Sequence, residues 1–395
     1  MKNNIYINLS AIVNYRKGKM PLEFSEIEKQ GFAPYIDIKL FDRGILSRFA
    51  KCDTKVTLVN KNDVLVVWDG ARFGLSAIGW EGVLGSTIVA LNSQYVLPKF
   101  LFYFIQSNFK KIQSKPRGVG IPHVEPSLFW NLPIPLPPLA EQKRIVKKIE
   151  ELFGVIDEQV KRLEATHAAL VSYRQSVLTD CLRKAAGVST TLGKTVKPRR
   201  ERVTFNGTNG NMIFIGMDCI ESNALKPHKT DLLRNTKSTC FIFHKDDVLY
   251  GRMRSYLNKV FKAETNGAAS AEFIVFPPTK DILPDYLKYL LHQQDFVSFA
   301  TRNASGDRPR VKFEEDLAPF PFTLPSLPEQ KAIVKKIENA FAFADKAQAA
   351  ITGALEQAKQ LKQSILKRAF EGKLVPQDPN DKPVDLTQIK KDKHK

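Results

Sequence analysis

The chain has 395 residues, of which 43% are hydrophobic, and a formal net charge of +19. This length suggests two or three domains, and so basic a folded protein favours a polyanionic partner, nucleic acid before membrane. The sequence shows neither an apolar run of membrane-spanning length nor an apolar signal segment at its start, and its four cysteines lack metal-ligand spacing. We therefore expect a cytoplasmic protein without a membrane partner or a metal site.

Residues 1–138 read as one globular α/β unit. Short β-type runs at 34–39, 63–68 and 85–91 are bounded by turn residues, and Pro98 opens an aromatic-rich amphipathic helix. A turn signal at Asp69-Gly70 leads to Arg72. A basic, glycine-rich loop spans residues 115–123 before the unit ends.

A long helix is predicted over residues 139–185, and it is one of two copies. Residues 136–153 and 324–341 are identical at 13 of 18 positions, and the offset of 188 holds without a gap as far as residue 178. Prolines precede both copies, which suits a helix start. Apolar residues recur every seven positions in each copy, which predicts a coiled-coil seam: Ile149, Ile156, Leu163, Leu170 and Val177, then Ile337, Ala344, Ile351, Ala358 and Ile365.

Residues 186–326 repeat the pattern of the first unit with weak identity. The segment 245–250 corresponds to 61–66, Leu283-Pro284 to Leu97-Pro98, and the basic loop 302–310 to 115–123. The second long helix follows at 327–373. Residues 374–395 are polar and are expected to be a mostly disordered tail.

Motifs for catalysis are absent from the sequence. The run Gly187 to Thr195 resembles a phosphate-binding loop but has five residues between its glycines instead of four. The methyltransferase Asn/Asp-Pro-Pro-aromatic signature is missing, and the six histidines show no ligand spacing. Asp246-Asp247 is interpreted as a solvated turn before a strand.

Two divergent domains, each followed by Leu-Pro-x-Leu-x-Glu-Gln-x-x-Ile-Val-x-Lys-Ile, resemble the specificity subunits of type I DNA restriction–modification systems. The stretch Gln363 to Leu374 is similar to that family's usual C-terminal sequence. The resemblance implies an α+β fold, with two α/β target-recognition domains (1–138 and 186–326) separated by two conserved helices packed as an antiparallel coiled coil.

Function and partners also follow from the resemblance. Each domain reads one half of a bipartite site on double-stranded DNA, and the helices dock two modification (methylase) subunits. This chain then has no catalytic role and no cofactor of its own. S-adenosylmethionine belongs to the modification subunits, and ATP and magnesium belong to separate restriction/translocase subunits. A helix of about 45 residues would span roughly 68 Å, which predicts unread bases between the half-sites.

The equivalent loops supply the groups that read bases and bind phosphates. The candidate DNA-binding residues are Arg72, Lys115, Arg117, His123, Arg199, Arg200, Arg252, Arg254, Tyr256, Arg302, Asn303, Arg308 and Arg310. The candidate docking residues are expected on the outward helix faces: Glu141, Gln142, Lys143, Lys147, Lys148, Glu329, Gln330, Lys331, Lys335 and Lys336.

Two other classes remain open. The chain could be a nuclease or methyltransferase in its own right, which methyl transfer by the purified chain alone would reveal. It could also be a coiled-coil scaffold that binds nucleic acid without sequence preference. Equal binding to random duplexes would favour the scaffold.

Overall fold

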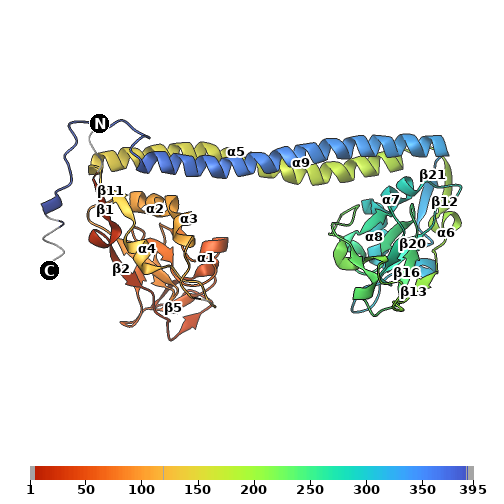
Figure 1. The fold of residues 1–395 in the computed structure, drawn as a ribbon, viewed down its shortest axis with the longest axis horizontal. Coiled ribbons are helices and arrows are strands. Elements are labelled where there is room, and N and C mark those ends of the chain that lie inside the picture. Colours follow the sequence, from red (N-terminus) through yellow and green to blue (C-terminus); the bar gives the residue numbers. More distant parts are fainter. Residues whose placement is uncertain (1–4, 119, 388, 390–395) are drawn as a thin grey trace. The chain divides into compact units, whose positions relative to one another are not determined.

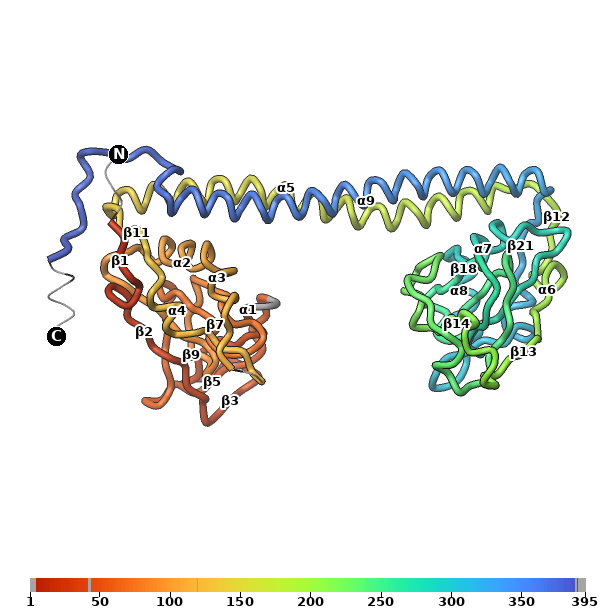
Figure 2. The backbone as a smooth tube through the Cα atoms, in the orientation of Figure 1, coloured from red at the N-terminus to blue at the C-terminus, as the bar shows by residue number. Residues whose placement is uncertain are grey.

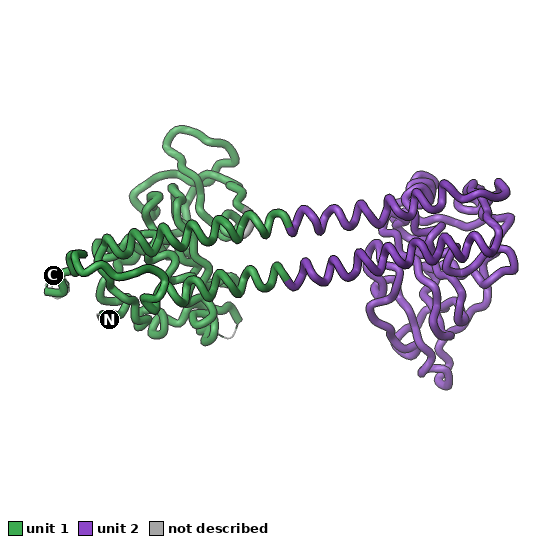
Figure 3. Tube along the Cα trace, turned by 90° about the horizontal axis from the view of Figure 1, so that it is seen from above, with its two compact units in different colours: residues 1–162, 354–395 green, residues 163–353 purple. Residues whose placement is uncertain are grey.

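The computed structural model describes residues 5–118, 120–387 and 389 (Figure 1). The basic end of the expected tail, residues 390–395, lies outside these. The chain forms two compact units (Figure 3). Unit 1 combines Met1–Arg162 with Ala354–Lys395, and unit 2 is Leu163–Gly353. We call residues 5–138 of unit 1 domain 1, and residues 186–326 of unit 2 domain 2.

Domain 1 contains three small sheets and several short helices. Figure 2 traces the path of its backbone. The antiparallel sheet has the order β2 (Asn14–Lys17), β10 (Ile88–Asn92), β7 (Val64–Val67) and β8 (Ser76–Ala77). The mixed sheet has the order β3 (Phe24–Ser25), β5 (Phe49–Lys51), β4 (Phe32–Ile36), β9 (Gly82–Leu84) and β6 (Leu58–Val59), with β4 parallel to β9. The third sheet pairs β1 (Tyr6–Asn8) with β11 (Pro133–Pro135).

The helices of domain 1 complete its core. They are α1 (Ile38–Arg43), α2 (Pro98–Ser107), α3 (Phe109–Gln113), α4 (Pro126–Trp130) and the 3-10 turn η1 (Leu9–Ala11). The inner residues of β7 and β10 are fully buried, and α2 packs Phe100 and Phe104 into the same core. The predicted helix at Pro98 and the strands predicted at 63–68 and 85–91 are therefore confirmed as α2, β7 and β10. The strand predicted at 34–39 is wrong at its end, because β4 stops at Ile36 and α1 begins at Ile38.

Domain 2 repeats this plan. Its first sheet has the order β18 (Val260–Lys262), β17 (Val248–Gly251) and β20 (Phe273–Phe276). The second has the order β13 (Arg202–Val203), β16 (Cys240–Phe243), β19 (Gly267–Ala269), β14 (Ile213–Ile215) and β15 (Asp231–Leu232). The third pairs β12 (Val188–Thr191) with β21 (Pro321–Leu324). Its helices are α6 (Leu192–Thr195), α7 (Pro284–His292) and α8 (Gln294–Asn303), with 3-10 turns η2 (Met217–Cys219), η3 (Leu233–Asn235) and η4 (Ser255–Leu257) and the π turn η5 (Phe313–Leu317).

The two long helices are present as predicted. They are α5 (Leu139–Arg183) and α9 (Leu327–Phe370). Seven of the ten predicted seam residues are buried, among them Ile149 and Ile337, and Leu163, Val177 and Ala358 are partly buried. Burying an isoleucine or leucine contributes about 1.5–3 kcal/mol, so this stripe is a main source of stability for the helices.

Each unit contains a contact between parts of the two helices. In unit 1, Asp157 of α5 pairs with Lys362 of α9. In unit 2, Arg174 of α5 pairs with Asp345 of α9 at 2.7 Å. Adding 188 to Asp157 gives Asp345, and subtracting 188 from Lys362 gives Arg174. The same contact therefore occurs twice, with the helices exchanging roles.

The repeated glutamines fix the start of each long helix. The side-chain oxygen of Gln142 accepts from the backbone N–H of Leu97 at 2.9 Å, and its amide donates to the carbonyls of Tyr95 and Pro137. The side chain of Gln330 makes the equivalent three bonds to Leu283, Asp281 and Pro325. Both glutamines are fully buried. We call these three bonds the glutamine joint, because they tie the start of a long helix to its domain. The joint explains why both helix copies have glutamine at this position.

Residues after α9 pack on domain 1, so the expectation of a mostly disordered tail is wrong for residues 374–387. Leu374, Val375, Val384 and Leu386 contact the core of unit 1. Asp381 accepts two hydrogen bonds from Arg144 of α5, at 2.6 and 3.3 Å. Position 144 is arginine in the first helix copy and alanine, Ala332, in the second. The arginine is therefore found in α5, the helix whose start contacts the tail, and not in α9.

Candidate nucleic-acid interface

The loop after the central strand begins with an equivalent backbone turn in both domains. In domain 1 it follows β7, and the N–H of Phe73 bonds to the carbonyl of Gly70 at 3.0 Å. In domain 2 it follows β17, and the N–H of Leu257 bonds to the carbonyl of Arg254 at 2.8 Å. These residues correspond at an offset of 184. A conserved backbone turn therefore carries different side chains in the two domains.

A second loop is hydrogen-bonded to the first, again in both domains. The N–H of Gly70 donates to the carbonyl of Pro122 at 2.8 Å, and the N–H of Arg254 donates to the carbonyl of Pro309 at 2.8 Å. Isolated bridges join Asp69 to His123 and Met253 to Arg310. We call each pair of loops a reading platform: residues 69–74 with 115–118 and 120–123, and residues 252–258 with 302–310. The sequence correctly predicted that these basic loops are equivalent.

On the platform of domain 1, Arg72, Lys115 and Arg117 are exposed. His123 is partly buried, and its Nδ1 lies 2.7 Å from a carboxylate oxygen of Asp69. The other oxygen of Asp69 pairs with Lys17 at 3.0 Å. The carboxylate of Asp69 therefore contacts both His123 and Lys17.

On the platform of domain 2, the exposed candidates are Arg254, Tyr256, Arg302, Asn303, Arg308 and Arg310. Arg310 pairs with Glu272 at 2.7 Å, and the amide of Asn303 donates to the carbonyl of Asp316. Arg252 is partly buried, with its backbone N–H bonded to the carbonyl of Glu272 at 2.8 Å. Arg252 occupies the position of Trp68 in domain 1, whose N–H bonds to Thr87 in the same way.

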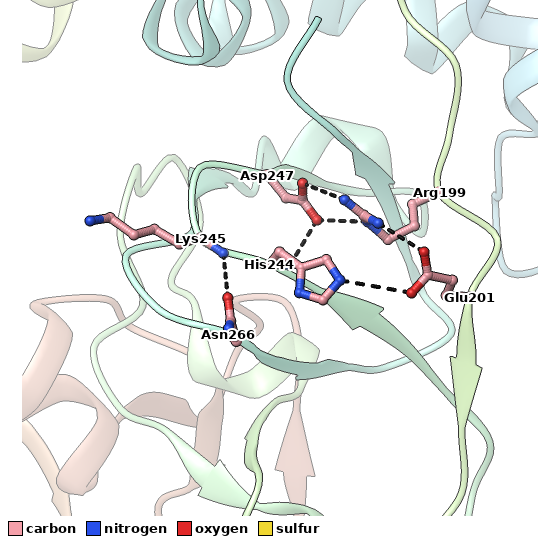
Figure 4. Close-up of polar contacts among 6 residues, drawn as sticks. All are labelled: Arg199, Glu201, His244, Lys245, Asp247 and Asn266. Carbon is pink, nitrogen blue, oxygen red and sulfur yellow. Dashed lines mark hydrogen bonds and ion pairs between the residues drawn. The ribbon is translucent and has the colours of Figure 1, made fainter.

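Arg199 does not belong to the platform of domain 2 and lies beside Asp247 and Glu201 (Figure 4). Its guanidinium donates two hydrogen bonds to Asp247, at 2.9 and 3.1 Å, and one to Glu201. Asp247 is fully buried and also accepts from the backbone N–H of His244. These bonds raise the pKa of Arg199 and neutralise its charge. The interpretation of Asp246-Asp247 as a solvated turn is wrong for Asp247, and Arg199 is a structural residue.

Domain 1 contains an equivalent pair of a buried aspartate and an arginine, which the sequence did not reveal. We call each of these aspartate–arginine pairs a latch. Asp63 is 2% exposed, accepts from Arg16 at 2.7 Å and from the backbone N–H of Asn60 at 2.9 Å. Arg16 and Asp63 are distant in sequence, so only the fold brings them together. Arg200, the neighbour of Arg199, is exposed on the surface and pairs with Glu314 at 2.9 Å.

The docking candidates separate into two groups. Glu141, Gln142 and Gln330 are buried, so the expectation that they face outward is wrong. Burial raises the pKa of Glu141, while Glu329 is partly buried and accepts from the backbone N–H of Ala186. Lys148 is partly exposed and pairs with Glu151. The other candidate lysines are exposed to solvent: Lys143, Lys147, Lys331, Lys335 and Lys336.

Nothing in the described residues forms a metal-binding group of His, Cys, Asp or Glu side chains. Nor does any helix in the described ranges combine the length and apolar composition of a membrane span. The run resembling a phosphate-binding loop forms β12 and α6, and the backbone of β12 pairs with β21. The backbone of residues 188–191 is therefore part of a two-stranded sheet.

Comparison with known proteins agrees with this geometry. The chain is 36% identical to the specificity subunit of the type I restriction enzyme MjaVIII of Methanocaldococcus jannaschii over 40% of this chain and 38% of that protein. It is 26% identical to the EcoDI specificity subunit of Escherichia coli over 91% of this chain and 90% of that protein.

Solved structures share the fold. One comes from work titled as the structural basis of complex assembly and conformational transition of the type I R-M system (TM-score 0.71, 19% identity, 93% of this chain and 97% of that one). The HsdS subunit of Thermoanaerobacter tengcongensis matches with a TM-score of 0.54 at 20% identity, over 93% of this chain and 96% of that one. The type I restriction modification DNA specificity domain matches residues 1–165 and 197–357, and the chain therefore belongs to this family.

Proposed function

We propose that this chain is the specificity subunit of a type I restriction–modification complex and that each domain reads one half of a bipartite DNA site. The observation that carries this proposal is the reading platform, which occurs twice on one backbone scaffold with different basic side chains. Phosphate contacts supply affinity and position, whereas side chains aimed at base edges supply sequence preference. A constant scaffold with variable side chains is suited to two different half-sites.

The long helices, in this proposal, form an antiparallel coiled coil. The twofold contact between Asp157 and Lys362 and between Arg174 and Asp345 supports it, because one antiparallel register produces both pairs. The exchange of roles at an offset of 188 is the relation expected when two copies of one helix sequence pair in antiparallel directions. Seam positions that recur every seven residues and are buried in both helices also support it.

Two modification subunits would dock on this helix pair. The exposed lysines occur twice at the offset of 188, and so do exposed apolar side chains. Val155 is 59% exposed and its equivalent Phe343 is 65% exposed, while Leu361 and its equivalent Tyr173 are 51% and 40% exposed. A surface repeated in this way fits two copies of one partner. The modification subunits would supply the methyl-transfer chemistry, and the restriction subunits would join the same complex.

A domain exchange tests the reading function. Residues 186–326 are replaced by the matching domain of a relative, and methylated sites are mapped in a host that carries the chain with its modification subunit. We expect one half-site to change and the other to stay. A change in both half-sites would contradict the two-reader proposal. A chain that directs methylation to no defined sequence would favour the non-specific scaffold.

Charge reversal tests the docking surface. We expect the combined change K143E, K147E, K331E and K335E to reduce co-purification of the modification subunit at least tenfold, because an interface that buries like charges loses several kcal/mol. The matched control is K61E with K245E, since both lysines lie in the turns before β7 and β17. Undiminished co-purification of the helix variant would place docking elsewhere.

A further inference from the structure

The reading turn needs a left-handed backbone at two positions in each domain. In domain 1 these are Gly70 and Gly74, with φ of 101° and 86°. In domain 2 the equivalent residues are Arg254 and Asn258, with φ of 54° and 49°. Glycine adopts this conformation readily, whereas other residues pay a steric cost. Domain 2 therefore accepts strain that domain 1 avoids.

Packing explains Asn258. Asparagine tolerates the left-handed region better than most residues. Its side chain is 2% exposed, and its amide donates to the carbonyl of His292 at 2.9 Å. The side chain therefore ties the end of η4 to α7. A glycine at this position would lose that bond.

Packing does not explain Arg254. Its backbone N–H bonds to Pro309, as the N–H of Gly70 bonds to Pro122, so a glycine would serve the backbone equally well. The side chain is exposed, and no other described residue forms a hydrogen bond or an ion pair with its guanidinium. By contrast, the guanidinium of Arg310 is held by Glu272. A strained residue with an unused side chain points to a function for that side chain.

The turn holds Arg254 in a fixed position. Ser255 is 2% exposed and lies beside the buried Tyr250, and Asn258 closes the turn against α7. The guanidinium is consequently attached to a turn whose neighbouring residues are buried, and no other described residue bonds to its donors. A planar guanidinium fork matches the O6 and N7 atoms of guanine in the major groove.

We propose that Arg254 determines a guanine in the half-site read by domain 2. This assignment rests on the proposed function and goes beyond it by naming one side chain and one base. Domain 1 has Gly70 at this position and must recognise its half-site with other side chains of its platform.

The experiment compares wild type with R254A, R254K and R254G as full chains with the modification subunit. Methylated-site mapping defines the half-site of domain 2. Affinity is then measured for that duplex and for the same duplex with 7-deazaguanine at each guanine in turn. The control is R234A, an exposed arginine on η3 outside the platform.

We expect R254A and R254G to bind the wild-type duplex roughly 10- to 100-fold more weakly and to lose preference at one G·C pair. R254K should lose most of the preference, because an ammonium lacks the fork. One 7-deazaguanine should weaken wild type but not R254A. R254G should keep a thermal midpoint within about 3 °C of wild type, because relief of strain offsets the greater freedom of the unfolded chain.

Two results would overturn the assignment: an R254A chain that keeps the same preference, or a domain 2 half-site without a guanine that responds to 7-deazaguanine. If wild type itself defines no bipartite site, the proposed function fails first, and the assignment falls with it. A loss of folding in R254G, seen as a lower midpoint, would show that the side chain has a structural role instead.

Discussion

Domain 1 and domain 2 share their backbone bonds far more than their side chains. The turn after the central strand, its bonds to the second loop and the glutamine joint occur in both. The side chains on this framework differ: Gly70 is replaced by Arg254, and Arg72 by Tyr256. Backbone groups must be bonded in any sequence that folds this way, whereas side chains on an exposed loop are free to change. The two domains therefore share a backbone scaffold, and each has its own set of side chains on it.

The buried latch gives the largest predicted difference between the domains. Asp247 holds Arg199 with two bonds, and the side chain of Arg199 is 17% exposed. Asp63 holds Arg16 with one bond, and Arg16 is 42% exposed. We expect D247A to destabilise unit 2 by about 3–5 kcal/mol, because Arg199 loses its buried partner and keeps the exposed Glu201 as its carboxylate partner. D63A should cost unit 1 about 1–3 kcal/mol.

The two units can be followed separately. All three tryptophans, Trp68, Trp80 and Trp130, lie in domain 1, so tryptophan fluorescence during urea unfolding reports on unit 1. Hydrogen exchange of amides in β17 and β20 reports on unit 2. Each variant should weaken its own unit. Equal losses from D63A and D247A would show that solvent exposure of the arginine does not set the cost.

Acid should weaken unit 2 through His292, a smaller effect. Burial lowers the pKa of His292 to about 4 from its ordinary value near 6.5, with a further lowering by Lys288. The unfolded chain therefore binds a proton that the folded chain excludes. The free energy of unfolding of unit 2 is therefore at its full value above pH 6.5. It decreases as the pH falls towards 4, by up to about 3 kcal/mol.

The corresponding residue in domain 1, Gln106, does not titrate, so H292Q provides the matched variant. Hydrogen exchange in β17 at pH 7 and pH 4.5 should show a loss of protection in wild type that H292Q reduces. Acidic groups elsewhere titrate in both chains and cancel in the comparison. An identical loss in H292Q would mean that His292 is not the group responsible.

Periodicity and repetition in the sequence were sufficient to predict the helices and the equivalence of the platforms. The seam residues recur every seven positions, and β7, β10 and α2 fall where alternating or amphipathic patterns place them. These features depend on neighbours along the chain. The exposed lysines and the platform loops were also identified, because basic loops at equivalent positions are visible without a fold.

Three errors have a common cause. Gln142 and Arg199 are polar residues in basic stretches, which favoured an exposed position. Their bonding partners, Leu97 and Asp247, are 45 and 48 residues away. The tail after α9 is polar in composition, yet Asp381 meets Arg144 across 237 residues. Long-range pairing of polar groups leaves no periodic signal, so the sequence alone did not reveal it.

Unit 1 is assembled from both ends of the chain, and this has a consequence for protein synthesis. Phe370 packs against Phe100 and Phe104, and residues 365–370 complete the core of the domain translated first. Unit 2 is continuous from Leu163 to Gly353. The ribosome therefore releases every part of unit 2 before unit 1 receives its last segment. Until then the nascent domain 1 has an apolar surface open to chaperones, and a premature stop codon before residue 365 would leave it incomplete.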